Sequence, residues 1–213
     1  MSKFLIVGDS QAQGTPGQFA ERKLQAAGHT TRRIANAGKG AIDYVNTPAL
    51  WSAYTSAVSS FRPDGVILIF GSNDFGSRLD DALLRMKNSV TPPVWMSGPP
   101  LYPETERQRL GESIRTINQQ VFGPRWIDAW PHTPLSLPRD SLQAHLPGEA
   151  GRPWGEAIAE RVMRDMTSLP QSSTQGGSVK LPFVETVVST RTIVIGAAGV
   201  LGLTVLAAVA ASR

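Results

Sequence analysis

The sequence contains no cysteine, and its three histidines, His29, His132 and His145, are scattered without metal-ligand spacing. Disulfides, thiolate nucleophiles and cysteine-ligated zinc or iron–sulfur sites are therefore excluded. We expect neither a metal nor a cofactor. Basic residues form no cluster or stripe, although the net charge is +4. A nucleic acid is therefore not an expected partner.

Hydrophobic residues make up 41% of the 213 positions and charged residues 18%, a balance typical of globular proteins. Short apolar runs that are typical of buried strands occur at 4–8, 65–71 and 94–98, with weaker candidates at 32–35 and 125–129. Segments with helical periodicity lie between them, at 18–27, 47–61, 77–90, 104–122 and 149–166. This alternation predicts an α/β fold, a three-layer sandwich around a central parallel sheet of about five strands.

The composition changes at residue 167, which divides the chain into a domain over 1–166, a Ser/Gln/Gly-rich linker over 167–192 and an apolar tail over 193–211. At ~1.5 Å per residue the tail would span roughly 28 Å, close to the thickness of a bilayer core. We therefore expect a single C-terminal transmembrane helix that anchors the protein in a membrane; a buried core helix is the alternative. Gly199 and Gly202 share a helix face and would allow helix-mediated oligomers, or they merely fill the span.

Residues suited to chemistry follow the expected strands. A Gly-Asp-Ser motif ends with Ser10 after the first strand, a glycine-rich segment at 36–40 follows the second, and Asn73 follows the third. The carboxyl ends of parallel strands share one sheet edge, where such folds bind ligands. His145, in the loop before the last helix, could reach this edge as a general base for Ser10. The amide of Asn73 could donate to a developing oxyanion.

These four motifs stand in the order of the blocks that mark the SGNH hydrolases, also called GDSL-type esterases, and residues 3–166 resemble that family. The resemblance implies a flavodoxin-like SGNH hydrolase fold. The catalytic residues it implies are Ser10 as nucleophile, His145 as base and Asp140 as the acid that orients the imidazole. The oxyanion hole it implies consists of the Ser10 and Gly40 N–H groups and the Asn73 side chain.

The sequence departs from the family pattern at two places. The family usually places the acid three residues before the histidine, where this chain has Leu142, whereas Asp140 lies five residues before. Asp128 is the alternative acid, and His132 is the alternative base. The glycine segment is one residue shorter than the common pattern, so Gly38 is the alternative oxyanion donor.

We expect the protein to hydrolyse a small ester or an acylated glycan, with a short acyl group such as acetyl on a carbohydrate or peptidoglycan. A lysophospholipase or thioesterase at a membrane surface is the enzymatic alternative. A phage virion or membrane-associated structural module that keeps the fold is the alternative from another class. The apolar run at 4–8 is too short for a signal peptide. A wall glycan would then be reached by another route, such as delivery in a phage particle.

Overall fold

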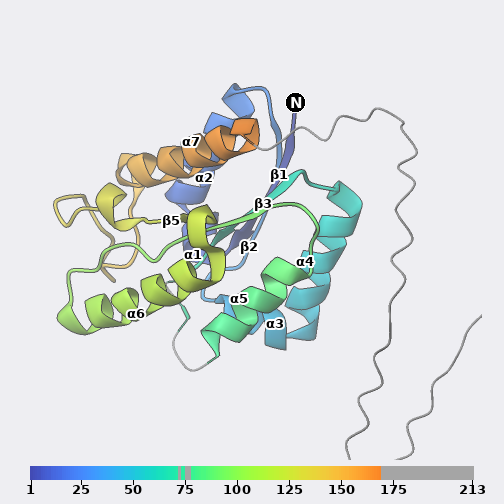
Figure 1. The fold of residues 1–213 in the computed structure, drawn as a ribbon. Coiled ribbons are helices and arrows are strands. Elements are labelled where there is room, and N and C mark those ends of the chain that lie inside the picture. The colour runs from blue at the N-terminus through green and yellow to red at the C-terminus, as the bar shows by residue number, and fades with distance from the viewer. Residues whose placement is uncertain (72, 75–77, 169–213) are drawn as a thin grey trace, which may run out of the picture. The chain divides into compact units, whose positions relative to one another are not determined.

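A five-stranded sheet forms the centre of the part of the chain that the computed structural model describes, residues 1–71, 73–74 and 78–168 (Figure 1). The strands are β1 (Lys3–Gly8), β2 (Thr30–Ala35), β3 (Gly65–Ile69), β4 (Val94–Ser97) and β5 (Trp126–Ile127). All neighbouring pairs are parallel, in the order β2-β1-β3-β4-β5. The predicted central parallel sheet is confirmed.

Helices cover both faces of the sheet and complete the three layers. The described helices are α1 (Ser10–Gln13), α2 (Thr15–Ala26), α3 (Ala41–Asn46), α4 (Pro48–Phe61), α5 (Leu79–Asn88), α6 (Thr105–Phe122) and α7 (Arg152–Ser168), with 3-10 turns at Gly123–Arg125, Trp130–His132 and Gly148–Gly151. Helices α3 to α6 pack on one face, and α1, α2 and α7 pack on the other (Figure 1).

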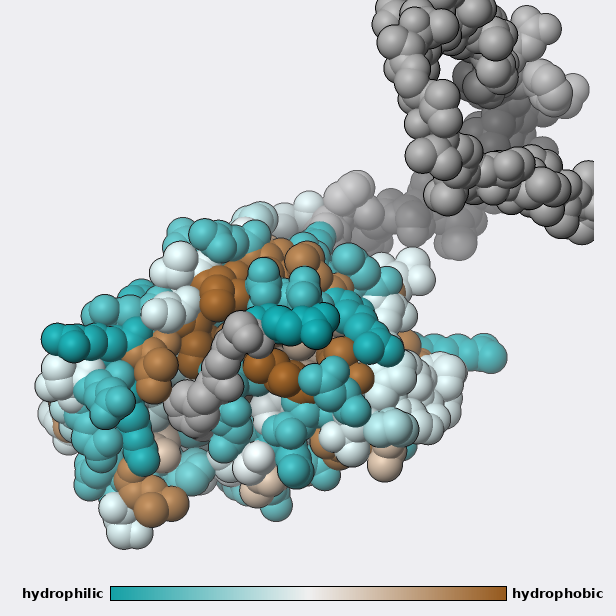
Figure 2. All heavy atoms as spheres, turned by 90° about the horizontal axis from the view of Figure 1, so that it is seen from below, coloured by the Kyte–Doolittle hydropathy of each residue, from teal (hydrophilic) through white to brown (hydrophobic). Residues whose placement is uncertain are grey.

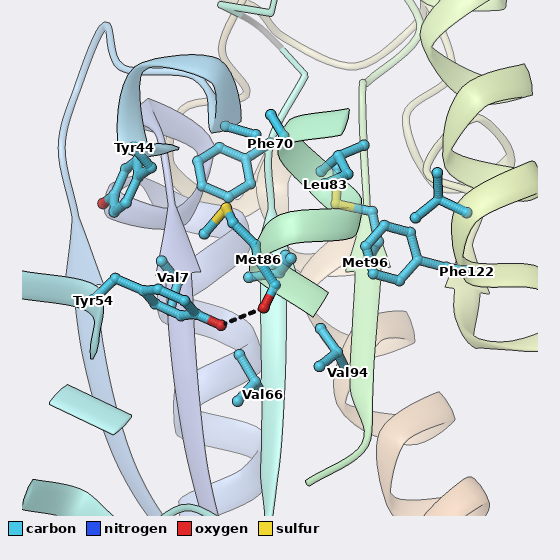
Figure 3. Close-up of a cluster of buried hydrophobic side chains, with 14 of the residues drawn as sticks. Val7, Tyr44, Tyr54, Val66, Phe70, Leu83, Met86, Val94, Met96 and Phe122 are labelled. Carbon is cyan, nitrogen blue, oxygen red and sulfur yellow. Dashed lines mark hydrogen bonds between the residues drawn. The ribbon is translucent and has the colours of Figure 1, made fainter. Parts of the chain in front are cut away.

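The two cores explain why β1 is apolar without alternation. Successive side chains of a strand point to opposite faces. Leu5 and Val7 accordingly join the core under α3 to α6, while Phe4 and Ile6 join the core under α2 and α7. All four are fully buried. Figure 3 shows part of the first core, where the Tyr54 hydroxyl donates to the Met86 carbonyl oxygen at 3.0 Å.

The strand order determines where a ligand can bind. From β1 the chain passes to β2 on one side of the sheet and then returns to β3 on the other side of β1. The connections after β1 and β3 therefore leave the same edge in opposite directions. In open α/β sheets this switch point opens a crevice at the carboxyl ends of the strands.

The elements agree with the sequence-based expectations except in short segments. Thr47 is the N-cap of α4 and Pro48 is its first residue, as the Thr-Pro pair predicts. Helix α3 was not predicted, because six residues are too few to establish a helical period. Helix α7 continues to Ser168, so the predicted linker loses its first two residues to this helix.

The predicted transmembrane segment 193–211 and nearly all of the linker lie outside the described residues. Among the residues that the structure describes, no helix combines the length and the apolar character needed to cross a membrane.

Close packing between α2 and α7 predicts the effect of a substitution at Gly155. A Cβ at this position would lie 2.4 Å from the Pro16 carbonyl oxygen and 2.6 Å from the Phe19 Cβ. We expect Gly155→Ala to lower the free energy of unfolding by about 1–3 kcal/mol, although alanine favours helices. Gly111→Ala in α6 is the control, because its Cβ would meet no atom closer than 3.4 Å. Urea denaturation should show this control at or above wild-type stability; equal effects at both sites would contradict the packing argument.

Candidate active site

Ser10 lies at the carboxyl end of β1, where the chain makes a tight turn into a helix. Gly8 ends the strand, and a Cβ there would lie 2.0 Å from the Ile69 carbonyl oxygen, so only glycine allows this approach of β1 to β3. Asp9 caps α1, and its Oδ1 accepts the Gln11 N–H at 2.8 Å. Ser10 is the first residue of this helix, where N–H groups lack intrahelical partners.

His145 and Asp140 meet Ser10 in a hydrogen-bonded series. The His145 Nε2 lies 2.8 Å from the Ser10 Oγ, and its Nδ1 lies 2.5 Å from the Asp140 Oδ2. This arrangement allows the ring to take a proton from Ser10 while the carboxylate fixes the orientation of the ring.

The five-residue spacing between Asp140 and His145 is accommodated by a closed turn. The Asp140 N–H donates to the His145 carbonyl oxygen at 3.1 Å, and the Gln143 N–H donates to the Asp140 carbonyl oxygen at 3.0 Å. Gln143 takes a left-handed conformation with φ of 55°. The turn therefore absorbs the two residues by which the sequence exceeds the family spacing.

Hydrogen bonds keep Asp140 ionised. Burial raises the pKa of this carboxyl, but the His145 ring and the N–H groups of His145 and Ala144 lower it by more. The net pKa lies below the ordinary value for aspartate. The two N–H groups lie 3.0–3.1 Å from the Asp140 Oδ1. At neutral pH a negative charge is therefore held against the imidazole.

Asn73 reaches the same site from the end of β3. Its Nδ2 donates to the Asp9 Oδ2 at 3.1 Å, and the residue lines the pocket that contains Ser10 and His145. A primary amide has two N–H groups. One is directed to Asp9, and the second has no acceptor among the residues that the structure describes.

The structure brings Gly38 rather than Gly40 to this pocket. The Gly40 N–H donates to the Asp43 Oδ2 at 3.0 Å at the start of α3. Gly40 is buried, and a Cβ there would lie 2.2 Å from the Asp74 Oδ1. Gly38, with φ of 73°, lines the pocket.

The alternative acid and base lie elsewhere. Asp128 accepts hydrogen bonds from the Arg115 guanidinium and from the Trp130 N–H. His132 lies in the turn Trp130–His132. Neither Asp128 nor His132 lines the pocket with Ser10.

The pocket has a volume of about 370 Å³ and is open to solvent. Beyond Ser10, Gly38, Asn73 and His145, its described lining consists of Ala37, Tyr102, Arg107, Leu142 and Ala144. A second hollow of about 170 Å³ also borders Ser10 and His145, on the side of Thr15 and Pro147. β1 runs downwards in Figure 1, so the view from below in Figure 2 faces this end of the sheet, where hydrophobic residues gather near the middle.

Side chains that the sequence did not single out hold the His145 loop in place. The Gln11 Nε2 donates to the Ala144 carbonyl oxygen at 2.7 Å, and the Thr15 hydroxyl donates to the Leu146 carbonyl oxygen. Arg107 donates to the Leu142 carbonyl oxygen at 2.7 Å. No local pattern reveals these contacts, because they join distant parts of the chain.

The described residues contain no group of three or more His, Asp or Glu side chains that could hold a metal ion.

Asp74, which follows Asn73 in the chain, is a buried carboxyl. Asp74 is 2% exposed, and its Oδ1 accepts the Ile42 N–H at 3.3 Å. Its Oδ2 has no hydrogen-bond partner within the described residues. The pKa of Asp74 is raised to about 7, chiefly by burial and in smaller part by the charge of Asp9, while hydrogen bonds from the Ile42 and Ala41 N–H groups partly offset these effects.

Asp74 should make the stability of the fold depend on pH. Its folded-state pKa of about 7 lies above the ordinary value of 3.8, so the folded protein binds this proton more tightly. Stability should fall as the pH rises from about 4 to 7. We expect Asp74→Asn to be more stable than wild type by about 2–4 kcal/mol at pH 8 and by much less at pH 4. Urea unfolding at both pH values measures this. Asp80→Asn, at an exposed position, is the control and should be as stable as wild type at both pH values. A stability difference between Asp74→Asn and wild type that is the same at both pH values would refute the buried titration.

No protein-family model and no curated protein sequence matches the chain. Solved structures do match it. The esterase EstA from Pseudoalteromonas sp. aligns with a TM-score of 0.57 at 12% identity, over 78% of this chain and 100% of that chain. A protein assigned as an SGNH hydrolase from Slackia heliotrinireducens aligns with a TM-score of 0.60 at 11% identity, over 76% and 98%. The acetyl xylan esterase AlAXEase aligns with a TM-score of 0.56 at 17% identity, again over 76% and 98%. The described part of the chain therefore has the fold of the SGNH hydrolases.

Proposed function

We propose that this chain is a serine esterase that transfers an acyl group to water through an acyl-serine intermediate. The observation that carries the proposal is the series Asp140–His145–Ser10, in which both ring nitrogens of His145 have a partner within 2.8 Å. Ser10 and His145 lie beside Asn73 in an open pocket at the switch point of the sheet.

In the first half of the reaction, the Ser10 Oγ attacks the ester carbonyl carbon and its proton passes to the His145 Nε2. The Nδ1–H of the resulting imidazolium donates to Asp140, whose negative charge stabilises the cation. The tetrahedral intermediate collapses, and the Nε2 proton passes to the departing alcohol. A water molecule then repeats the sequence on the acyl-serine, which releases the acid and restores Ser10.

The oxyanion is stabilised by the second N–H of the Asn73 amide, by the Ser10 N–H and by an N–H of the glycine segment. Gly38 is the better third donor, because it lines the pocket with Asn73 whereas the Gly40 N–H donates to Asp43. One such donor typically contributes about 3–4 kcal/mol to transition-state stabilisation.

The substrate we propose is an acetylated carbohydrate or peptidoglycan. A pocket of about 370 Å³ that opens to solvent accommodates a short acyl group with a polar alcohol at the surface. One structural neighbour is an acetyl xylan esterase, and this supports the same class of substrate.

Ser10→Ala removes the proposed nucleophile. We expect it to abolish turnover of 4-nitrophenyl acetate and labelling by a fluorophosphonate probe, while the circular dichroism spectrum and the melting temperature stay at wild-type values. Ser113→Ala, on the exposed surface of α6, is the control and should keep full activity. Wild-type turnover by Ser10→Ala would rule out the acyl-serine mechanism.

Substitution of the acid distinguishes Asp140 from Asp128. Asp140→Asn should lower kcat by roughly 10²–10⁴, because the imidazolium loses its charged partner. Asp128→Asn should have a much smaller effect, because Asp128 pairs with Arg115. If Asp128→Asn lowered kcat more than Asp140→Asn, Asp128 would be the acid that orients His145.

The proposal includes membrane anchoring by residues 193–211, which is supported by the apolar composition of this segment. The full chain should float with phosphatidylcholine vesicles in a flotation assay, because water does not solvate so long an apolar segment. A chain shortened to residues 1–177 should stay in the aqueous fraction with unchanged kcat. A full chain that remained monomeric in the aqueous fraction would contradict the anchor.

A further inference from the structure

The pocket beside Ser10 carries a permanent positive charge in its wall. Arg107 on α6 lines the pocket. The other lining residues that the structure describes are His145 and uncharged groups, among them Tyr102, Leu142 and Ala144. A charge in a pocket with apolar walls acts more strongly on a ligand than the same charge on an open surface. The part of the pocket next to Arg107 therefore favours an anionic group.

Arg107 is fixed in this wall and keeps donors to spare. One of its Nη atoms donates to the Leu142 carbonyl oxygen at 2.7 Å, and its Nε lies 3.3 Å from the Glu104 Oε2. These contacts engage at most two of the five N–H groups of a guanidinium. The remaining N–H groups can form the two parallel hydrogen bonds with which arginine binds a carboxylate.

The pairing with Glu104 does not cancel this charge. The Glu104 side chain is 55% exposed, and that of Arg107 is 38% exposed. Solvent-exposed ion pairs of this kind contribute little, because water screens both partners. A carboxylate inside the pocket is shielded from water on more sides than Glu104 and competes effectively for the guanidinium.

We propose that Arg107 makes the esterase selective for esters whose alcohol part carries a carboxylate, such as an O-acetylated acidic sugar. The inference rests on the proposed function, and it specifies the substrate of that same site. An acetyl group has no position for a charge, so the carboxylate belongs to the alcohol that leaves. Arg107 then holds the alcohol while His145 delivers the proton to its oxygen.

The test compares 4-acetoxybenzoate with its neutral counterpart 4-acetoxybenzamide, which release phenols of similar leaving ability. The wild-type enzyme should prefer the anion in kcat/KM, and added KCl should weaken this preference because salt screens charges. Arg107→Gln should lower the ratio of anion to amide about tenfold, mainly through KM. Arg107→Lys should retain part of the preference for the anion. Arg109→Gln, an exposed position on the same helix, is the matched control and should keep all of it.

A purely structural role of Arg107 gives a different result. If this residue only positions the His145 loop through Leu142, Arg107→Gln lowers kcat for both esters equally and leaves their ratio unchanged. That outcome would overturn the proposal. An unchanged ratio with undiminished rates would overturn it as well.

A binding measurement separates this inference from the proposed reaction. Calorimetric titration of Ser10→Ala with 4-acetoxybenzoate reports binding without turnover. The double variant with Arg107→Gln should bind this ligand about tenfold more weakly, while its affinity for the amide changes little. Equal affinities of the two variants for the anion would refute the Arg107 contact. If the wild-type protein hydrolyses neither ester, the proposed esterase activity is refuted. The binding measurement then still tests the contact between Arg107 and the carboxylate.

Discussion

The candidate site depends on one buried carboxylate, that of Asp9. Its Oδ1 accepts the Gln11 N–H and so caps the helix that begins at Ser10, while its Oδ2 accepts the Asn73 amide at 3.1 Å. Its backbone N–H donates to the Ile69 carbonyl oxygen at 3.2 Å. One side chain thus joins the ends of β1 and β3. The proposed nucleophile, Ser10, directly follows Asp9 in the chain, and the Asn73 amide donates to the Asp9 carboxylate, so both residues line the same pocket.

The fold could be predicted wherever burial on both faces imposed an unbroken apolar run. This holds for β1 and β3, which lie inside the sheet between helical layers, and for β4. Prediction was poorest for elements fixed by contacts rather than by composition. Strand β5 has only two residues, and the chain turns after Ala129 into a 3-10 segment. Helix α3 has six residues, and its start is fixed by the hydrogen bond from the Gly40 N–H to the Asp43 carboxylate.

The site could be predicted at the level of strand ends, since the carboxyl ends of parallel strands share an edge whatever their sequence. That argument suffices to place Ser10 and Asn73 together. It does not determine which glycine N–H faces the pocket, because the hydrogen bond from Gly40 to Asp43 is not visible in the spacing. Nor does it reveal Gln11, whose bond to the Ala144 carbonyl oxygen connects positions 133 residues apart.

The closed turn between Asp140 and His145 has a consequence for motion. Asp140 binds the ring, the backbone N–H and the carbonyl oxygen of His145 at once, so the two residues form one small rigid body. When the loop shifts, the distance between carboxylate and imidazole stays constant, and the separation between the His145 Nε2 and the Ser10 Oγ is the coordinate that changes. Any displacement of this loop should therefore change the distance between the His145 Nε2 and the Ser10 Oγ more than the distance between the Asp140 carboxylate and the imidazole.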